Sequence, residues 1–272
     1  MLSIYSTAFN VIKNNFDYKD AVKNFCLFAQ EVVISINKSD DDTWEAFEEL
    51  KKTYGNLTTI PASVSYEDPC IDGKLFNLAL QNTTQEFKIL LGLDQRIPLR
   101  QRENWEQLAY SLRFASHDAY LIPVLDLWGS ENKIRWDPET NVSFQWFLHK
   151  DGLERGVVDF AQLPNGKFDP SKSDSSELIY PDGKLVKHEH YLQGGSPTNL
   201  EDYLLALEEQ SVYVFHLGYM NFENRIKVNE DIWREQWEEI RPPEKRENAV
   251  ALSVEELKKH PTFKHNLKLW HE

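Results

Sequence analysis

The first hundred residues alternate between two spacings of apolar side chains. Short runs of apolar and β-branched residues predict buried strands, and between them apolar residues recur at helical spacing. The predicted strands are 2–8, 31–36, 57–60 and 87–93, and the predicted helices are 17–29, 42–55 and one that begins at 72–74. Strands that alternate with helices favour crossover connections, so we predict an α/β fold in which helices flank a mainly parallel sheet.

The second half of the chain has a weaker pattern. Residues 104–115 have helical spacing, and residues 119–127 are typical of a strand. The stretch 128–195 is rich in Gly, Pro, Asp and Ser, which favours loops and short strands over a second domain. Residues 211–215 predict a strand that ends at His216, and residues 231–240 predict a helix that the following prolines break.

Helix starts are marked by a polar residue with Glu three positions later, the signature of a capping box. The three predicted boxes are Asp42 with Glu45, Thr198 with Glu201, and Ser253 with Glu256. Together these elements predict one large domain over 1–240, with halves at 1–97 and 98–240, followed by a helical tail at 241–272.

Composition narrows the classes of function. The chain has 272 residues, of which 41% are hydrophobic, and this is enough to bury one substantial core. A formal net charge of -14 repels phosphate backbones, so we expect no nucleic-acid partner. A nucleotide ligand is still compatible, because a metal ion can reverse the field of a small site. Two cysteines, Cys26 and Cys70, make neither a disulfide framework nor a zinc site.

The sequence contains no apolar run of the length that a membrane span needs. The apolar residues at the N-terminus have no basic region before them, as a secretory signal would. We therefore expect a cytoplasmic protein, and a peripheral contact with a membrane is compatible with this expectation.

Polar residues gather where the predicted strands end. In open parallel sheets, ligands bind beyond the carboxyl ends of the strands, at the point where the strand order reverses. The polar segments in these positions are 7–10, 37–43, 68–74 and 94–96, and they include several acids. Their convergence predicts a small-molecule site at one edge of the sheet.

These segments also resemble a known family. Residues 4–10, Ile-Tyr-Ser-Thr-Ala-Phe-Asn, and residues 31–43 are similar to the first two strands and turns of the GT-A glycosyltransferases, in particular those of the family 2 type. Asp72-Gly73-Lys74 resembles the helix that supplies a basic residue near the nucleotide. Residues 87–94 resemble the strand that delivers an Asp-x-Asp metal motif. The resemblance covers about the first hundred residues.

The resemblance implies a nucleotide-sugar-binding half at 1–97 and an acceptor-side half at 98–240. The donor-binding residues that it implies are Thr7, Ala8, Asn10, Asn37, Asp72, Lys74 and Asp94. It also implies Mn²⁺ or Mg²⁺ held by Asp94, which is a hard oxygen ligand, and by a histidine on a late strand, for which His216 is the candidate. Gly218 would let the backbone approach a ligand closely. The family motif has an acid where this chain has Gly92, so a single carboxylate is left for the metal.

An inverting transferase also needs a general base that deprotonates the acceptor hydroxyl. The spacing usual in the family brings Glu177, Asp182 and Glu189 into range, and we choose Glu177 because a loop meets an apolar pair there. A retaining enzyme would need no such base, and the sequence leaves the stereochemistry open.

The function implied by the resemblance is transfer of a sugar from a UDP- or GDP-sugar to a glycan or glycolipid acceptor, as in polysaccharide biosynthesis. One alternative is a catalytically inactive protein of the same fold that binds sugars or nucleotides. Another is a nucleotidyltransferase, which would usually carry a glycine-rich basic loop after the first strand. Residues 7–12 contain no glycine, which also excludes the Gly-x-Gly-x-x-Gly form of a nicotinamide-dependent reductase.

Overall fold

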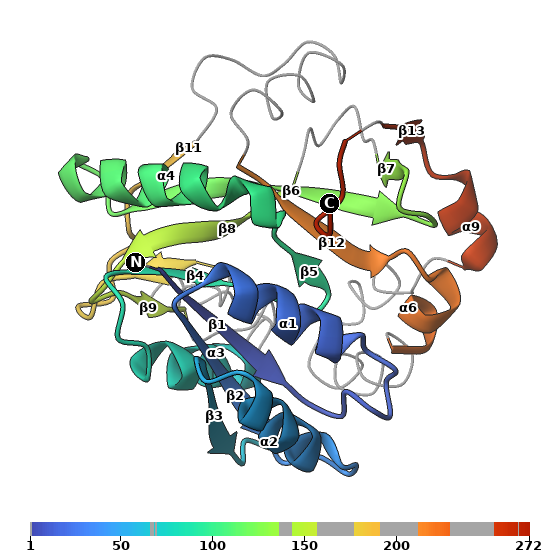
Figure 1. Cartoon of the computed structure of the whole chain (residues 1–272), viewed down its shortest axis with the longest axis horizontal. Coiled ribbons are helices and arrows are strands. Elements are labelled where there is room, and N and C mark those ends of the chain that lie inside the picture. Colours follow the sequence, from blue (N-terminus) through green and yellow to red (C-terminus); the bar gives the residue numbers. More distant parts are fainter. Residues whose placement is uncertain are drawn as a thin grey trace, which may run out of the picture.

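The computed structural model describes residues 2–65, 68, 70–135, 143–156, 177–190, 212–228, 253–265 and 267–272. Within these residues an eleven-stranded sheet runs through the centre of the molecule, and helices lie against both of its faces (Figure 1). The predicted fold class, a mixed α/β fold with a largely parallel central sheet, is confirmed.

The first half of the chain folds as the apolar pattern predicts. Its elements are β1 (Leu2–Ala8), α1 (Tyr18–Phe28), β2 (Glu31–Asn37), α2 (Thr43–Thr53), β3 (Leu57–Ala62), α3 (Ile71–Gln81) and β4 (Phe87–Leu90). β1 pairs in parallel with β2 and with β4, and β2 pairs in parallel with β3. The chain therefore moves outward from β1 to β3 and then returns to the other side of β1. This reversal makes a switch point at the carboxyl ends of β1 and β4, where ligands bind in sheets of this kind.

The second half extends the sheet with both antiparallel and parallel pairs. Its elements are β5 (Gln95–Arg96), η1 (Leu99–Gln101), α4 (Arg102–Phe114), β6 (Ala119–Trp128), β7 (Lys133–Arg135), β8 (Ser143–Lys150), β9 (Glu154–Arg155), β10 (Leu178–Ile179), β11 (His188–His190), β12 (Val214–Tyr219), α6 (Phe222–Val228), α9 (Val254–Lys259) and β13 (Thr262–Lys264). The sheet order is β13-β7-β6-β8-β4-β1-β2-β3. β12 joins this sheet through β6 and β5.

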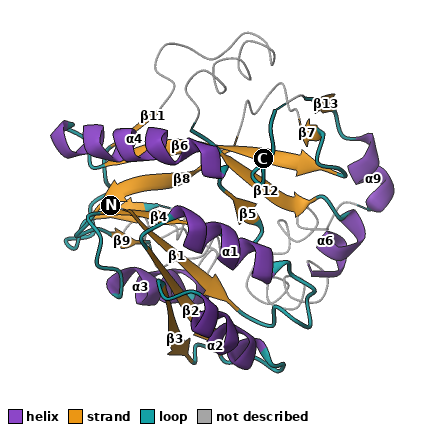
Figure 2. Ribbon diagram, viewed as in Figure 1, coloured by secondary structure: helices purple, strands orange, loops and turns teal. Residues whose placement is uncertain are grey.

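The two faces of the sheet bury different helices (Figure 2). On one face, alternate β1 residues such as Ile4 pack with Phe25 of α1, Phe47 of α2 and Trp105 of α4. On the other face, the intervening β1 residue Tyr5 packs with Ala79 and Leu80 of α3. The period of two in a strand sends neighbouring side chains to opposite layers, which explains this division.

Two strand boundaries and one missed strand are the main differences from the prediction. β4 ends at Leu90 rather than at residue 93, because the chain then turns and Gln95 N donates to Gly92 O at 3.0 Å. β12 begins at Val214 and runs through His216 to Tyr219, since β6 and β5 pair with it there. The prediction of loops and short strands over 128–195 missed β8, which is eight residues long and lies between β6 and β4.

The predicted capping boxes have different outcomes. The Ser253–Glu256 box forms at the start of α9. The Asp42–Glu45 box does not, because the Asp42 side chain makes no cap bond, although Asp42 is at the N-cap position of α2. Asp41 takes over part of this role by accepting from Thr43 N at 3.0 Å. The Thr198–Glu201 box and the predicted helix at 231–240 lie outside the described residues.

The last residues of the chain dock on the domain. The guanidinium of Arg100 donates to Lys268 O and to Leu269 O, at 2.6 Å each. The indole of Trp270 is buried and donates to Asp20 Oδ2 at 3.2 Å. The predicted domain boundaries stay predictions. None of the helices in the described ranges has both the length and the apolar character that crossing a bilayer requires.

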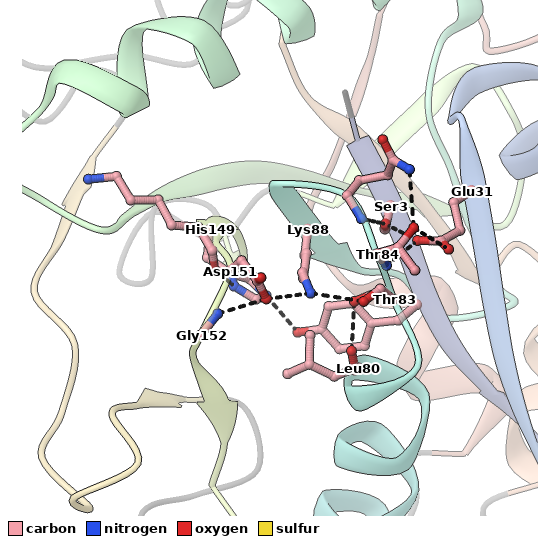
Figure 3. Close-up of polar contacts among 12 residues, drawn as sticks. Ser3, Glu31, Leu80, Thr83, Thr84, Lys88, His149, Asp151 and Gly152 are labelled. Atoms are coloured by element: carbon pink, nitrogen blue, oxygen red, sulfur yellow. Dashed lines mark hydrogen bonds and ion pairs between the residues drawn. The ribbon is translucent and has the colours of Figure 1, made fainter.

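A polar network closes the amino-terminal edge of the sheet (Figure 3). The Glu31 carboxylate accepts from the backbone N and the hydroxyl of Thr84, at 2.7 Å and 2.9 Å. Nearby, Lys88 is buried and its ammonium lies 2.7 Å from Asp151 Oδ1. Because these groups satisfy one another, they fit a structural role at the edge opposite the predicted site.

Candidate metal and donor site

The structure brings Asp94 and His216 together. Asp94 lies in the turn after β4, and His216 lies in β12. Asp94 Oδ2 is 3.0 Å from His216 Nε2. The backbone fixes this pair, because Leu217 N donates to Asp94 O at 2.7 Å and Gln95 pairs with His216 between β5 and β12. Two residues 122 positions apart in the sequence therefore meet at one sheet edge.

A second carboxylate, Asp126 of β6, holds the other side of the histidine ring. Asp126 Oδ1 is 2.6 Å from His216 Nδ1, and the two residues are direct partners in the β6–β12 pairing. The sequence interpretation missed Asp126. The available signal was an acid within the apolar run 119–127, where a charged group needs a partner or a function.

Mutual attraction shifts the ionisation of this cluster. Burial by itself would lower the pKa of His216, but Asp94 and Asp126 outweigh it and raise that pKa to about 10. Burial opposes the charged form of Asp94, yet His216 and Arg225 hold its pKa well below the usual range. Without a metal, the group is thus an imidazolium between two carboxylates.

The geometry fits a divalent cation. Around an octahedral ion with bonds of about 2.1 Å, neighbouring ligand atoms lie about 3 Å apart, which matches the Asp94–His216 separation. Asp126 on Nδ1 completes a carboxylate–histidine arrangement that directs Nε2 toward a metal. A Cβ on Gly218 would lie 2.6 Å from His216 Nε2 and 3.0 Å from Asp94 Oδ2, so only glycine leaves this space open. Metal binding would displace the proton on Nε2.

Two protein ligands, rather than three, face this point. In the part of the chain that the structure describes, no group of three or more His, Cys, Asp or Glu side chains is arranged to hold a metal. Asp126 does not count as a third ligand because it contacts the opposite ring nitrogen. A cation here would complete its shell with water and ligand oxygens, as Mg²⁺ commonly does with phosphates.

Two arginines flank the acids. Arg225 Nη1 of α6 lies 3.8 Å from Asp94 Oδ2, and Arg135 Nη1 of β7 lies 3.9 Å from Asp126 Oδ2. Neither arginine was among the residues chosen from the sequence. Each of the two carboxylates around His216 therefore has an arginine beside it.

The predicted donor residues after β1 and β2 shape two interlocked loops. Thr7 and Ala8 end β1, paired with Ser35 and Ile36 of β2. Asn10 has a positive φ of 43°, and its Oδ1 accepts from Asp40 N at 2.8 Å. These contacts hold the β1 loop against the β2 loop at the predicted edge of the sheet.

Asn37 ties the β2 loop to the segment after β3. Its amide is buried, donates to Val64 O at 3.0 Å and accepts from Val64 N at 2.8 Å. Asp72 and Lys74 lie in the first turn of α3, and the Lys74 ammonium pairs with Asp68. Donor contacts by these residues stay predictions, and Lys74 would have to exchange its carboxylate partner for a phosphate.

Glu177 is not brought to this site. It directly precedes β10, whose Leu178 packs with Ala119 at the start of β6. Asp126 is near the other end of that strand, roughly 20 Å away at the usual rise per residue. Figure 1 likewise shows β9, the partner of β10, on the side of the sheet away from α6.

The fold and the site thus define an α/β protein in which a histidine lies between two carboxylates beyond the carboxyl ends of the parallel strands. No protein-family model matches the chain, and no curated protein matches its sequence.

Solved structures that resemble the chain do so in part of its length. TarS of S. aureus in complex with UDP is 21% identical, over 46% of this chain and 36% of that chain, with a TM-score of 0.37. The mannosyltransferase PcManGT from Pyrobaculum calidifontis, in complex with GDP-Man and Mn²⁺, is 14% identical over 55% and 44%, with a TM-score of 0.39. A 4-diphosphocytidyl-2C-methyl-D-erythritol synthase from Anaerococcus prevotii is 13% identical over 78% and 96%, with a TM-score of 0.39. The chain spans less than half the length of the TarS chain in the first match.

Proposed function

We propose that this chain is a glycosyltransferase that uses a divalent cation to transfer a sugar from a nucleotide-diphosphate sugar to a glycan or glycolipid acceptor. The observation that carries the proposal is the pairing of Asp94 Oδ2 with His216 Nε2 at 3.0 Å, beside the switch point of the sheet. The resemblance of residues 4–10, 31–43 and 87–94 to GT-A motifs supports the same function.

Each group at the site has a role in this chemistry. Asp94 and His216 would hold Mn²⁺ or Mg²⁺, and Asp126 keeps Nε2 of His216 directed toward Asp94. A bound divalent cation supplies stabilisation of the negative charge that develops on the departing diphosphate. The interlocked loops after β1 and β2 shape the donor side of the site. The proposal does not use Glu177, because the fold places it away from Asp94.

The test is turnover of a panel of UDP- and GDP-sugars with Mn²⁺ or Mg²⁺, measured as release of the nucleoside diphosphate. The wild-type chain should turn over at least one donor, and a chelator should stop the reaction. Asp94→Asn should lower the rate about a hundredfold or more, because several kcal/mol of charge stabilisation are lost. The exposed α4 residue Glu103 provides the control, since Glu103→Gln removes the same charge from a helix that contributes no residue to the site.

The other candidate functions give different results in this assay. Release of inorganic pyrophosphate from nucleoside triphosphates, with no sugar transfer, would indicate a nucleotidyltransferase. Metal-dependent donor binding without turnover would indicate an inactive binding protein. An Asp94→Asn variant with full activity would remove the metal assignment.

A further inference from the structure

Arg225 contacts the proposed metal ligand without making a hydrogen bond to it. Its Nη1 lies 3.8 Å from Asp94 Oδ2, the same oxygen that faces His216 Nε2. The Arg225 Nε is buried and has no hydrogen-bond partner among the described residues. The side chain is 25% exposed, and Asp94 beside it is 23% exposed. A guanidinium has five donors suited to carboxylate or phosphate oxygens, and within the described residues the donor on Nε is unused.

Aromatic rings hold this guanidinium in place. It lies over the Tyr219 ring, 5.1 Å from the centroid, and Tyr219 stacks on Trp128 at 4.5 Å. The first residue of α6, Phe222, packs edge-on against Trp128 at 5.5 Å. Gly129, at a φ of 68°, leaves room for Phe222, since a Cβ there would lie 3.0 Å from its ring. The packing of Tyr219 and Phe222 on Trp128 therefore positions the helix that carries Arg225 beside Asp94.

A divalent cation would make the site more attractive to an anion than the metal-free protein, in which protonated His216 contributes a single positive charge. Asp94 and Asp126 carry two negative charges, and Arg225 and Arg135 carry two positive charges, so these four groups cancel. A divalent cation on Asp94 and on neutral His216 would then give the site a net charge of about +2. This balances the two ionised phosphates of a nucleotide sugar.

We propose that Arg225 exchanges partners: it pairs with Asp94 in the metal-free protein, and it binds the diphosphate when a divalent cation occupies Asp94 and His216. This inference rests on the proposed function and adds a substrate-binding residue to it. The cation and the guanidinium compete for Asp94 because like charges repel at this distance. Leaving Asp94 costs Arg225 little, since their contact at 3.8 Å is longer than a hydrogen bond. Phosphate oxygens would give Arg225 the charge-assisted hydrogen bonds that it lacks.

The experiment measures the two halves of this exchange separately. Binding of Mn²⁺ alone is followed by the loss of the free-ion electron paramagnetic resonance signal. Binding of inorganic pyrophosphate is followed by calorimetry at a fixed, saturating concentration of free Mn²⁺. The variants are Arg225→Gln and Arg225→Lys, with Arg102→Gln as the matched control. Arg102 lies on α4 and is 47% exposed, and its nearest ion-pair contact is Glu106 at 3.6 Å on the same helix.

We expect opposite effects in the two measurements. Arg225→Gln should bind Mn²⁺ as tightly as the wild type or more tightly, because a competing cation is gone. It should bind pyrophosphate about tenfold more weakly or worse, because charge-assisted hydrogen bonds are lost. Arg225→Lys keeps the positive charge but lacks the paired donors of a guanidinium, so its pyrophosphate affinity should lie between those of the wild type and Arg225→Gln. This variant replaces Arg225→Gln if the glutamine variant does not fold. Arg102→Gln should match the wild type in both measurements.

Failures of the two proposals can be distinguished. If the wild type binds Mn²⁺ and pyrophosphate, and Asp94→Asn abolishes both, the proposed metal site stands. Equal pyrophosphate affinities for the Arg225 variants and Arg102→Gln would then overturn the exchange alone, as would weaker Mn²⁺ binding by Arg225→Gln. If the wild type binds no Mn²⁺, or if Asp94→Asn binds it equally well, both proposals fail.

Discussion

At the scale of single residues, Gly218 decides whether the space between Asp94 and His216 is accessible. Any other residue would place its Cβ 2.6 Å from His216 Nε2, closer than real Cβ atoms approach another heavy atom. The φ of Gly218 is not in the left-handed region, so a larger residue there would be excluded by the two side chains rather than by backbone strain. The site therefore requires glycine at position 218, whereas the backbone conformation there does not.

Gly218→Ala should therefore weaken Mn²⁺ binding while the chain stays folded. We expect the dissociation constant to rise about 10- to 100-fold, the range seen when groups that orient metal ligands are disturbed. The measurement is a Mn²⁺ titration followed by electron paramagnetic resonance. The control is Gly55→Ala, because a Cβ at Gly55 has no neighbour within 4 Å. Unchanged Mn²⁺ affinity in Gly218→Ala would argue against a metal between these side chains.

At the scale of elements, the short helix α9 supports the aromatic layer under Arg225. Trp128 Nε1 donates to Leu257 O of α9 at 2.7 Å, and Leu257 is buried. The helix has six residues, which is too short to be stable alone, so its capping box contributes a large part of its local stability. α2 also has an N-cap acid, Asp42, but that side chain makes no cap bond.

The two N-caps should respond differently to truncation. Ser253→Ala should lower the free energy of unfolding by about 1 kcal/mol, because it removes the hydroxyl that accepts from Glu256 N in a formed capping box. Asp42→Ala, at an exposed cap that makes no side-chain bond, should change it by less than about 0.5 kcal/mol. Urea denaturation of the wild type and both variants measures this difference. A larger loss for Asp42→Ala than for Ser253→Ala would contradict the cap assignments.

At the scale of the whole molecule, a buried histidine links stability to pH. Burial first, and then the neighbouring Arg155 and Lys88, lower the pKa of His149 to about 3. The His149 Nε2 atom lies 3.1 Å from Tyr5 Oη, and its Nδ1 atom lies 2.8 Å from Lys150 O. A carbonyl can only accept, so the ring proton lies on Nδ1 and Nε2 accepts from the tyrosine. The folded protein thus needs this ring to be neutral.

Acidification should destabilise the fold through His149. Between about pH 6.5 and pH 3 the unfolded chain binds a proton here and the folded chain does not, so the stability falls as the pH falls. From pH 7 to pH 5 the contribution of this group is about 2 kcal/mol. His149→Gln should flatten the dependence by that amount, and the exposed His271→Gln should not. Urea denaturation at both pH values measures it, and parallel pH profiles for wild type and His149→Gln would contradict the assignment.

The pattern of the chain determined the elements of the first half. β1, β2 and α1 lie where alternation and helical spacing predict them, because each buries a face whose period is readable from neighbouring residues. The meeting of Asp94 with His216 was also predictable in outline, since the carboxyl ends of parallel strands share one edge. Two of the failed predictions were local: β4 ends early because the turn after it forms its own hydrogen bonds, and Asp42 does not cap.

Only the tertiary structure decided which groups surround that pair. Asp126 faces His216 because β6 and β12 pair in one particular register, and a shift by a single residue would send its side chain to the other face. Arg225 reaches Asp94 because Phe222 docks α6 onto Trp128. Such contacts join segments that are about a hundred residues apart in the sequence, and the spacing of neighbouring residues does not predict them. The sequence alone determined the layers and the acid at the strand end, whereas the fold decided which charges and which open space surround it.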